Sequence, residues 1–272
     1  MGWLKHLVKR ALAVRGYRLE SGKPEPPREI GNLRHLALAY EHLLNETAGS
    51  EVVPADERRP EILGRLLGTP PPEAYAIVQA LARTAEIDGD VCEFGVAQGE
   101  TSALIANEIR RGSRRLHLFD SFEGLPPPTG RDSLTHDIFS LGSIEAYAGA
   151  MACPEDQVQA RLADVGFPRD RFTIHRGFIE ELIHRDRNLP SRVSFAYVDF
   201  DFYEPIAIAL DYLHQVTRPG AIVIVDDYDF FSTGSKSAVD EFVARHSAQR
   251  EHYSLRISPP ALGYFAELER IA

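Results

Sequence analysis

Aspartates gather in two short runs, and these runs hold the residues best suited to chemistry. Residues 198–204 read VDFDFYE and residues 225–229 read VDDYD, each after an apolar segment typical of a buried strand. If the two strands are neighbours in a parallel sheet, about 5 Å apart, their carboxylates converge at one edge. Anions in one place repel unless a cation lies between them, and oxygen ligands suit Mg²⁺ or Mn²⁺. The runs therefore predict a site for a hard cation, although Asp201 and Asp229 can instead face solvent or cap helices.

Two motifs earlier in the sequence favour a ribose-bearing cofactor. Residues 93–102 read EFGVAQGETS, and glycines in such a run let the backbone approach a ligand at the start of a helix. The spacing is not the dinucleotide fingerprint Gly-x-Gly-x-x-Gly, so a structural turn explains this run equally well. Asp120 ends the next expected strand, where an acidic side chain either binds ribose hydroxyls or caps the turn. Together the two motifs favour ribose binding.

Other kinds of catalytic residue find little support. The sequence has no Gly-x-Ser-x-Gly elbow and no cluster of histidine and cysteine that would indicate zinc. Cys92 lies in an apolar run, where a buried inert thiol is the simpler interpretation, and Cys153 stands beside a proline at an expected helix start. His136 and Lys236 are left as side chains to test, although solvent exposure is the simpler explanation for His136.

Length and composition are those of one soluble α/β domain with additional elements. The chain has 272 residues and a formal net charge of −10. We expect no nucleic-acid partner, because phosphate binding usually leaves a basic footprint. Two cysteines give no disulfide framework, and no stretch approaches the roughly 18 apolar residues of a membrane span. The N-terminus also lacks the pattern of a secretory signal, so we expect a cytoplasmic protein.

Alternating strand and helix patterns from residue 90 onward predict a mostly parallel sheet with helices on both faces. Expected strands cover residues 91–94, 116–120, 172–175, 195–200 and 221–225, and expected helices cover 101–111, 154–165, 178–184, 205–215 and 235–246. Two last strands, at 253–257 and 263–267, are expected to form an antiparallel pair at the edge. The long connection at 126–142 is expected to act as a lid.

Residues 1–88 are expected to form a helical extension before the domain at 89–272. Residues 3–18 have the pattern of a basic amphipathic helix, which can lie on an anionic membrane or dock on the domain or a second subunit. We favour docking, because one short anchor binds membranes weakly. Residues 21–28 form a proline-rich linker, and further helices at 33–47, 61–67 and 73–86 can serve as a lid or an oligomer contact. A homo-oligomer is therefore expected.

At these motifs the sequence resembles the macrocin O-methyltransferase family, metal-dependent class I methyltransferases that act on sugars of natural products. The resemblance covers about residues 89–266. It is carried by CEFGV at 92–96, FDSFEGLP at 119–126, VDFDFYE at 198–204, PG at 219–220 with VDDY at 225–228, and SAVDEF at 237–242. It implies a Rossmann-like class I methyltransferase fold with seven strands, S-adenosylmethionine (SAM) as cofactor, and a small-molecule or glycan sugar as acceptor.

Matched position by position, the resemblance implies roles for individual residues. Asp199, Asp226 and Asp227 resemble ligands of Mg²⁺ or Mn²⁺, and Asp199 also resembles the general base. The implied cofactor-binding residues are Glu93, Gly95, Thr101, Ser102, Asp120, Ser121, Gly177 and Phe178. The run AQGE at 97–100 departs from the family pattern of an aromatic and a basic residue followed by paired glycines, which leaves the contacts on the acceptor side open.

The expected reaction is in-line displacement at the sulfonium methyl by a substrate oxygen, which the cation activates and Asp199 deprotonates. Two other functions compete with this one. A nicotinamide-dependent dehydrogenase uses the same kind of sheet, although its glycine fingerprint is absent. A non-catalytic scaffold in glycan assembly would keep the fold without the chemistry, although the complete set of three aspartates argues against it.

Overall fold

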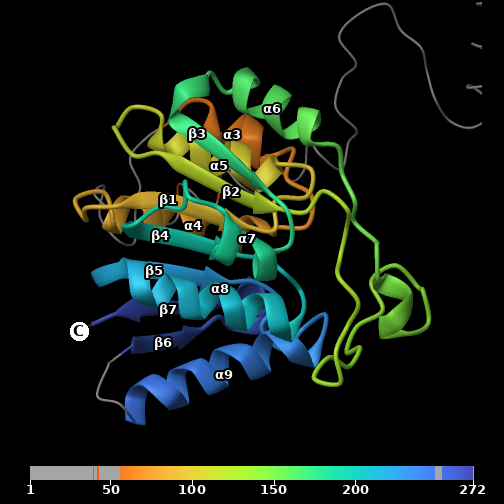
Figure 1. Ribbon diagram of the computed structural model, residues 1–272. Coiled ribbons are helices and arrows are strands. Elements are labelled where there is room, and N and C mark those ends of the chain that lie inside the picture. Colours follow the sequence, from red (N-terminus) through yellow and green to blue (C-terminus); the bar gives the residue numbers. More distant parts are fainter. Residues whose placement is uncertain (1–38, 40–41, 43–55, 249–252, 272) are drawn as a thin grey trace, which may run out of the picture.

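The computed structural model describes residues 56–248 and 253–271, together with residues 39 and 42, and one seven-stranded sheet forms its centre (Figure 1). The strands are β1 (Asp90–Phe94), β2 (Leu116–Asp120), β3 (Phe172–Arg176), β4 (Val193–Val198), β5 (Thr217–Val225), β6 (Tyr253–Ile257) and β7 (Ala266–Arg270). Their order in the sheet is β3-β2-β1-β4-β5-β7-β6. Strands β1 to β5 pair in parallel, whereas β7 pairs antiparallel with both β5 and β6.

This topology confirms the predicted parallel sheet with an antiparallel edge hairpin, while several strand boundaries differ from the prediction; β5, for example, begins at Thr217 instead of residue 221. Strand β4 ends at Val198 instead of residue 200, so that Asp199 lies directly beyond the strand. The Asp199 amide donates a hydrogen bond to the Phe94 carbonyl at 2.7 Å, which joins the ends of β4 and β1. Strand β7 begins at Ala266 instead of residue 263, because a 3₁₀ turn and Gly263, with φ of +114°, precede it.

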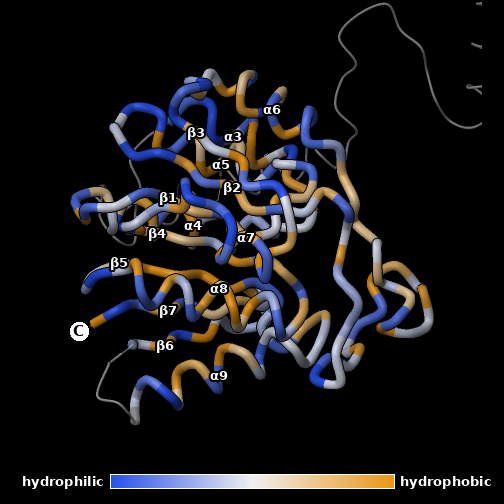
Figure 2. The backbone as a smooth tube through the Cα atoms, viewed as in Figure 1, coloured by the Kyte–Doolittle hydropathy of each residue, from blue (hydrophilic) through white to orange (hydrophobic). Residues whose placement is uncertain are grey.

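Helices cover both faces of the sheet, as in other doubly wound folds. The described helices are α3 (Arg59–Leu63), α4 (Pro71–Arg83), α5 (Glu100–Ile109), α6 (Glu155–Asp164), α7 (Ile179–Arg185), α8 (Tyr203–Val216) and α9 (Thr233–Ala248). Helices α4, α5 and α6 share a hydrophobic cluster with one face, and α7, α8 and α9 share one with the other. Along β4 the side chains alternate: Phe195 and Tyr197 face the first cluster, and Ala196 and Val198 the second. The apolar colouring of β5 in Figure 2 reflects burial on both faces.

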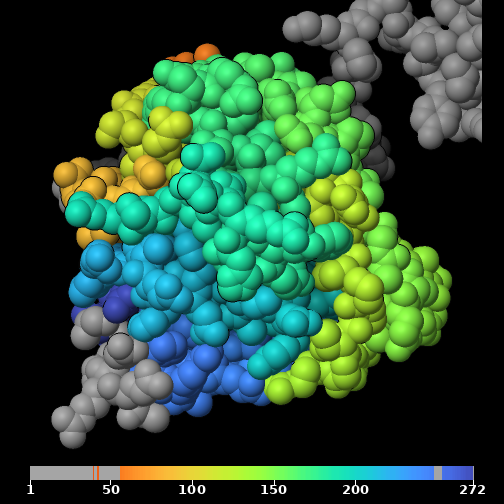
Figure 3. All heavy atoms as spheres, viewed as in Figure 1, coloured from red at the N-terminus to blue at the C-terminus, as the bar shows by residue number. Residues whose placement is uncertain are grey.

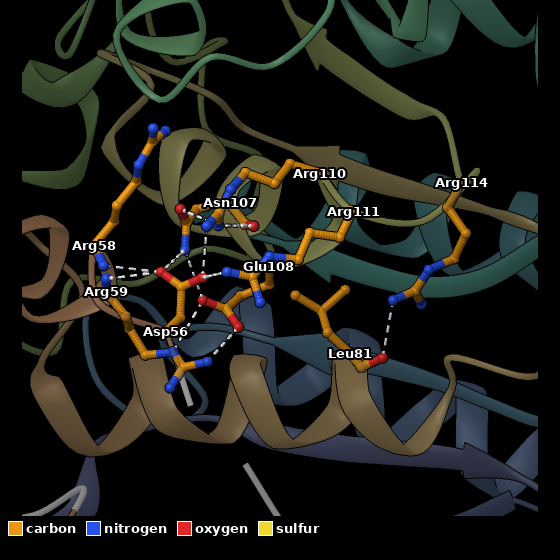
Figure 4. A network of polar contacts seen from close by, with 9 residues as sticks. All are labelled: Asp56, Arg58, Arg59, Leu81, Asn107, Glu108, Arg110, Arg111 and Arg114. Atoms are coloured by element: carbon orange, nitrogen blue, oxygen red, sulfur yellow. Dashed lines mark hydrogen bonds and ion pairs between the residues drawn. The ribbon is translucent and has the colours of Figure 1, made fainter. Parts of the chain in front are cut away.

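A polar network fastens α3 to α5 (Figure 4). The Asp56 carboxylate accepts hydrogen bonds from the side chains of Arg110 at 2.7 Å and Asn107 at 3.2 Å. Although burial raises the pKa of Asp56, these hydrogen bonds outweigh it and lower the pKa to about 2. Arg59 is fully buried and donates two hydrogen bonds to Glu108, at 2.9 and 2.7 Å. The start of the described chain is therefore tied to the helix that follows β1.

The N-terminal predictions lie only partly within the described residues. The predicted helix at 3–18 and the linker at 21–28 lie outside them, and of the predicted helix at 33–47 only residues 39 and 42 are described, both helical. Helix α4 matches the predicted helix at 73–86 and packs in the same hydrophobic cluster as β1 and β4. The boundary after residue 88 stays a prediction. None of the described helices has the length and apolar character needed to cross a membrane.

Candidate functional site

A cavity of about 580 Å³ opens at the carboxyl edge of the parallel strands, where ligands bind in doubly wound sheets. The loops after β1, β2, β3, β4 and β5 all contribute to its wall. Most of the predicted site residues line it: Glu93, Gly95, Thr101, Asp120, Ser121, Gly177, Phe178, Asp199, Asp226 and Asp227. The remaining predicted residue, Ser102, is fully buried in α5 next to Thr101. The structure therefore brings the predicted residues together around one space.

The loop between β1 and α5 passes so close to the end of β4 that only glycine fits at its start. Gly95 has φ of +83°, and a Cβ atom there would lie 1.8 Å from the carbonyl oxygen of Asp199. Gly99, with φ of +80°, caps the start of α5. The first N–H groups of a helix have no partner within the helix, so they are available to polar groups of a ligand. The loop can therefore bring backbone donors against a cofactor.

Asp120 fastens this loop to the end of β2. Its Oδ2 accepts hydrogen bonds from the amides of Val96 at 2.7 Å and Ala97 at 2.8 Å, and its Oδ1 accepts one from the amide of Phe122 at 2.6 Å. The turn-capping alternative is thus present in the structure. A carboxylate has about four lone-pair positions, so Asp120 keeps acceptor capacity on the side that lines the cavity. Ribose binding by Asp120 stays a prediction.

Glu93 is a buried carboxyl in the cavity wall. Its side chain is 1% exposed, and burial raises its pKa to about 8, although the nearby Ser102 hydroxyl lowers it. Among the described residues, Glu93 Oε2 and Ser102 Oγ find no hydrogen-bond partner of normal geometry. Buried polar atoms without partners are rare in native proteins and often mark the place of a ligand or a water molecule. Glu93 Oε2 therefore fits a cofactor that brings a polar group into the cavity, whereas Ser102 does not line it.

Three other predicted cofactor residues shape the wall mainly through the backbone. The Ser121 hydroxyl donates to the Gly124 carbonyl at 3.2 Å and so closes the turn after β2. The Gly177 amide donates to the Asp120 carbonyl at 2.9 Å, which joins the ends of β3 and β2. Phe178 caps the start of α7 with an extended backbone. Their cofactor contacts stay predictions, and the structure places all three beside the same cavity.

The sequence did not reveal the wall that follows α3. Leu67, Gly68 and Thr69 line the cavity, and the Thr69 hydroxyl is hydrogen-bonded to the Thr101 hydroxyl at 2.9 Å. In the sequence this stretch has only the pattern of a helix end before prolines. The position of this stretch at the site depends on the tertiary contacts of α3, and the local residue pattern does not predict such contacts.

Aspartates from the ends of β4 and β5 form the acidic side of the cavity. Asp226 is held at both carboxylate oxygens: the Tyr197 hydroxyl donates to Oδ2 at 2.7 Å and the Asp227 amide donates to Oδ1 at 2.7 Å. Burial, and then the charges of Asp226 and Asp227, raise the pKa of Asp199 well above its ordinary range. Burial, Asp226 and Asp201 do the same to the pKa of Asp227. The carboxylates are thus near enough to oppose one another's ionisation.

Of the two further aspartates, the structure buries one and exposes the other. Asp201 is 7% exposed, so the alternative that it faces solvent is wrong, and its carbonyl accepts a hydrogen bond from Ser232 at 2.7 Å. Asp229 is exposed and pairs with Lys236 Nζ at 3.0 Å, which makes Lys236 a surface partner. The ring of His136 lies 2.7 Å from a carbonyl oxygen of the loop after β5. His136 and Lys236 therefore have structural explanations.

The expected lid at 126–142 has a fastened base and an exposed tip. At its base the buried Asp132 accepts a hydrogen bond from the Tyr203 amide, at the start of α8, at 2.8 Å. Near its tip, Ile138 and Phe139 line the cavity although their side chains are 42% and 53% exposed. In Figure 3 the yellow-green connection between β2 and α6 forms a lobe at the side of the molecule. A lid function stays a prediction.

Comparison with known proteins identifies the family. The family model for macrocin O-methyltransferases (TylF) matches residues 74–254, which is more than half of the chain and includes every loop of the cavity described from α4 to α9. The chain belongs to the macrocin O-methyltransferase family. The resemblance seen in the sequence motifs is thereby confirmed.

Individual relatives agree with membership of the macrocin O-methyltransferase family. The chain is 29% identical over 164 residues to 8-demethyl-8-(2,3-dimethoxy-alpha-L-rhamnosyl)-tetracenomycin-C 4'-O-methyltransferase of Streptomyces olivaceus; the match covers 59% of this chain and 60% of that protein. The O-methyltransferase NovP superposes with a TM-score of 0.62 at 19% identity, covering 87% of this chain and all of that one. The calicheamicin methyltransferase CalS11 gives a TM-score of 0.55 at 18% identity, covering 93% and 99%. The class I methyltransferase fold is therefore confirmed.

In this member of the macrocin O-methyltransferase family, the three predicted metal ligands have the donor chemistry of a site for a hard cation. Asp199, Asp226 and Asp227 offer oxygen ligands alone, which suit Mg²⁺ or Mn²⁺, and burial raises the pKa of each. A cation would relieve this opposition between charges. Across residues 56–248 and 253–271, however, no three Asp, Glu, His or Cys side chains are gathered as a ligand set. The donor chemistry therefore fits a hard cation, although the arrangement is not that of a completed site.

Proposed function

We propose that this protein is a SAM-dependent O-methyltransferase that methylates a hydroxyl of a sugar or of a glycosylated small molecule, assisted by Mg²⁺ or Mn²⁺. One observation carries the proposal: in a member of this family, a single cavity joins the glycine loop after β1, the acidic end of β2 and the aspartates after β4 and β5. A relative named for methylation of a rhamnosyl tetracenomycin supports a sugar acceptor. The identity of the sugar is left open.

Residues on the β1 side of the cavity are proposed to bind the cofactor. When bound, SAM supplies a methyl group on a positively charged sulfur, so the protein has chiefly to align it with the acceptor. Asp120 can accept hydrogen bonds from the ribose, and the α5 N-terminus offers backbone donors. Glu93, with its pKa of about 8, is mostly protonated at neutral pH, so it can both donate and accept a hydrogen bond.

Residues on the β4 and β5 side are proposed to activate the acceptor. Asp199, Asp226 and Asp227 would hold the cation, which when bound lowers the pKa of a hydroxyl that coordinates it. Asp199 lies at the crossing with the cofactor loop, where its carbonyl oxygen meets Gly95. With a cation bound, the Asp199 carboxylate would be ionised and could take up a proton. We therefore propose that Asp199 accepts the proton of the attacking hydroxyl.

The test is methyl transfer from SAM to a panel of free sugars and glycosylated small molecules, followed as the mass of one added methyl group. We expect turnover that EDTA abolishes and that Mg²⁺ or Mn²⁺ restores. Asp226→Asn should lower turnover by roughly 100-fold or more, because a catalytic cation contributes several kcal/mol. Full activity in EDTA would exclude the metal role. Hydride transfer with a nicotinamide cofactor, or SAM binding without turnover on any acceptor, would favour the dehydrogenase or the scaffold instead.

Assembly and location complete the proposal. We propose that the protein is a cytoplasmic homo-oligomer in which the N-terminal extension makes subunit contacts. Residues 3–18 are the segment that we propose for any contact with a membrane. Light scattering of the full chain and of a chain that starts at residue 19 would measure the contribution of this segment to the oligomer. Co-sedimentation of the same two chains with anionic vesicles would measure membrane contact.

A further inference from the structure

A buried tyrosine hydroxyl lies between the acidic side of the cavity and the first turn of α4. Tyr197, fully buried on β4, places its hydroxyl 2.7 Å from Asp226 Oδ2 and 3.2 Å from Glu73 Oε1. Glu73 is 1% exposed and is the third residue of α4. A helix that precedes the sheet in the sequence therefore reaches the acidic cluster through the Tyr197 hydroxyl and also through a direct hydrogen bond between the side chains of Glu73 and Asp226.

The distances assign the hydroxyl proton to Asp226. A tyrosine hydroxyl has one proton, and 2.7 Å is the usual length of an O–H···O bond, whereas 3.2 Å is longer than the usual range. The backbone of Asp226 is held as well, because its amide donates to the Val198 carbonyl at 2.9 Å and its carbonyl accepts from the Ser235 hydroxyl at 2.7 Å. Asp226 is thus fixed through both its main chain and its side chain.

These hydrogen bonds set the direction of the remaining lone pairs on the Asp226 carboxylate. Each carboxylate oxygen of Asp226 has about two acceptor positions, of which the Tyr197 hydroxyl occupies one on Oδ2 and the Asp227 amide one on Oδ1. The two donors thereby fix the orientation of the carboxylate, and with it the directions of its unoccupied acceptor positions. Loss of a partner of this kind, which holds a metal ligand in one orientation, typically lowers metal affinity by about 10- to 100-fold.

We propose that Tyr197 is a positioning residue that orients Asp226 towards the cation, and that Glu73 keeps the Tyr197 hydroxyl in place. The inference rests on the proposed function, because it concerns the same metal site. It makes helix α4 part of the machinery that holds the cation, rather than only a cover on the sheet.

The primary test measures Mn²⁺ binding by calorimetry to the full-length protein loaded with SAM, without any acceptor. Tyr197→Phe removes the hydroxyl and keeps the ring, and should weaken Mn²⁺ binding about 10- to 100-fold. The SAM dissociation constant and the unfolding midpoint in EDTA should stay close to those of the control variant. That control is Tyr212→Phe, which removes the hydroxyl that Tyr212 donates to the Pro190 carbonyl at 2.7 Å on the other face of the sheet.

Glu73 variants provide a second, independent measurement in case Tyr197→Phe fails to fold. Glu73→Gln keeps the size of the side chain and, through its amide group, a hydrogen-bond donor to the oxygen of the Tyr197 hydroxyl, so Mn²⁺ affinity should fall by less than about threefold. Glu73→Leu keeps the volume and removes the polar contact, so its loss should approach that of Tyr197→Phe. This ranking is not expected if Glu73 only fills space, because leucine packs at least as well as glutamine in a buried position.

Each outcome decides between the two proposals. Equal Mn²⁺ affinity in the wild type, Tyr197→Phe and Glu73→Leu overturns the positioning role and leaves the proposed function standing. An equal loss in Tyr212→Phe shows a general effect of removing a tyrosine hydroxyl and also overturns the role. A wild-type protein without saturable Mn²⁺ binding, which still transfers methyl groups in EDTA, overturns the metal part of the proposed function and this role together.

Discussion

Glu93→Gln is the substitution for which the structure gives the most quantitative expectation. The Glu93 carboxyl is buried in the cavity wall, and one of its oxygens lacks a hydrogen-bond partner within the described residues. Glutamine has nearly the same shape and cannot ionise. The variant therefore removes the ability of this position to carry a charge and changes little else. Its stability should differ from that of the wild type by an amount that depends on pH.

The sign and size follow from the pKa in the two states. The carboxyl has a pKa of about 8 in the folded protein, against 4.5 as its ordinary value in the unfolded chain. Below pH 4.5 both states keep the proton, so ionisation of Glu93 costs the fold nothing. Between pH 4.5 and about 8 only the unfolded chain releases it, so the free energy of unfolding falls by up to about 1.4 kcal/mol per pH unit. The loss is on the order of 5 kcal/mol and is constant at higher pH.

Urea unfolding of both proteins without SAM or metal, at pH 5, 6, 7 and 8, measures this directly. The free energy of unfolding of Glu93→Gln should rise relative to that of the wild type as the pH increases, by several kcal/mol between pH 5 and pH 8. Glu123→Gln is the matched control, because it makes the same chemical change at an exposed residue. Parallel stability curves for the wild type and Glu93→Gln from pH 5 to 8 would refute the reasoning, since they would show that Glu93 ionises in the fold as it does in the unfolded chain.

Two other substitutions test contacts that hold the elements around the cavity together. Gly95→Ala puts a Cβ atom 1.8 Å from the Asp199 carbonyl oxygen, so we expect the ends of β1 and β4 to move apart, SAM affinity to fall at least about tenfold in calorimetry, and stability to drop by several kcal/mol. Glu108→Gln removes the negative charge that pairs with the buried Arg59 and should lower the free energy of unfolding by about 3 kcal/mol in urea, because a buried ion pair is broken. An unchanged unfolding midpoint would contradict this.

The arrangement of the site could be predicted where it depends on the ends of parallel strands. Apolar runs followed by acidic residues locate the ends of β2, β4 and β5 within two residues, and the parallel order then places these ends at one edge. This is why Asp120, Asp199 and Asp226 could be expected around one cavity. The exact end of β4 could not, because the backbone leaves the extended conformation within the acidic run, where Asp201 has φ of +63°, and the residue types of the run do not reveal this turn.

What the sequence could not predict are contacts that neither periodicity nor strand order determines. The Glu73 carboxyl and the Tyr197 hydroxyl are 124 positions apart, and each side chain has a simple local explanation, as a first-turn glutamate and a strand tyrosine. The sequence left open whether Asp201 is buried or exposed, for a related reason. Its carbonyl bond to Ser232 requires the loops after β4 and β5 to fold against each other, and an acidic run alone is equally typical of an exposed loop.

The cavity combines a fixed part with a part that is held less firmly, and this division fits the chemistry proposed. Asp226 is fixed through main-chain and side-chain hydrogen bonds, and Gly95 through a crossing that admits no larger residue. By contrast, Leu67, Ile138 and Phe139 line the same cavity with side chains 63%, 42% and 53% exposed. Alignment for methyl transfer tolerates little displacement, whereas apolar side chains on an exposed rim can change with little cost to the fold. Members of one family can therefore keep the reacting groups in place while the rim adapts to different acceptors.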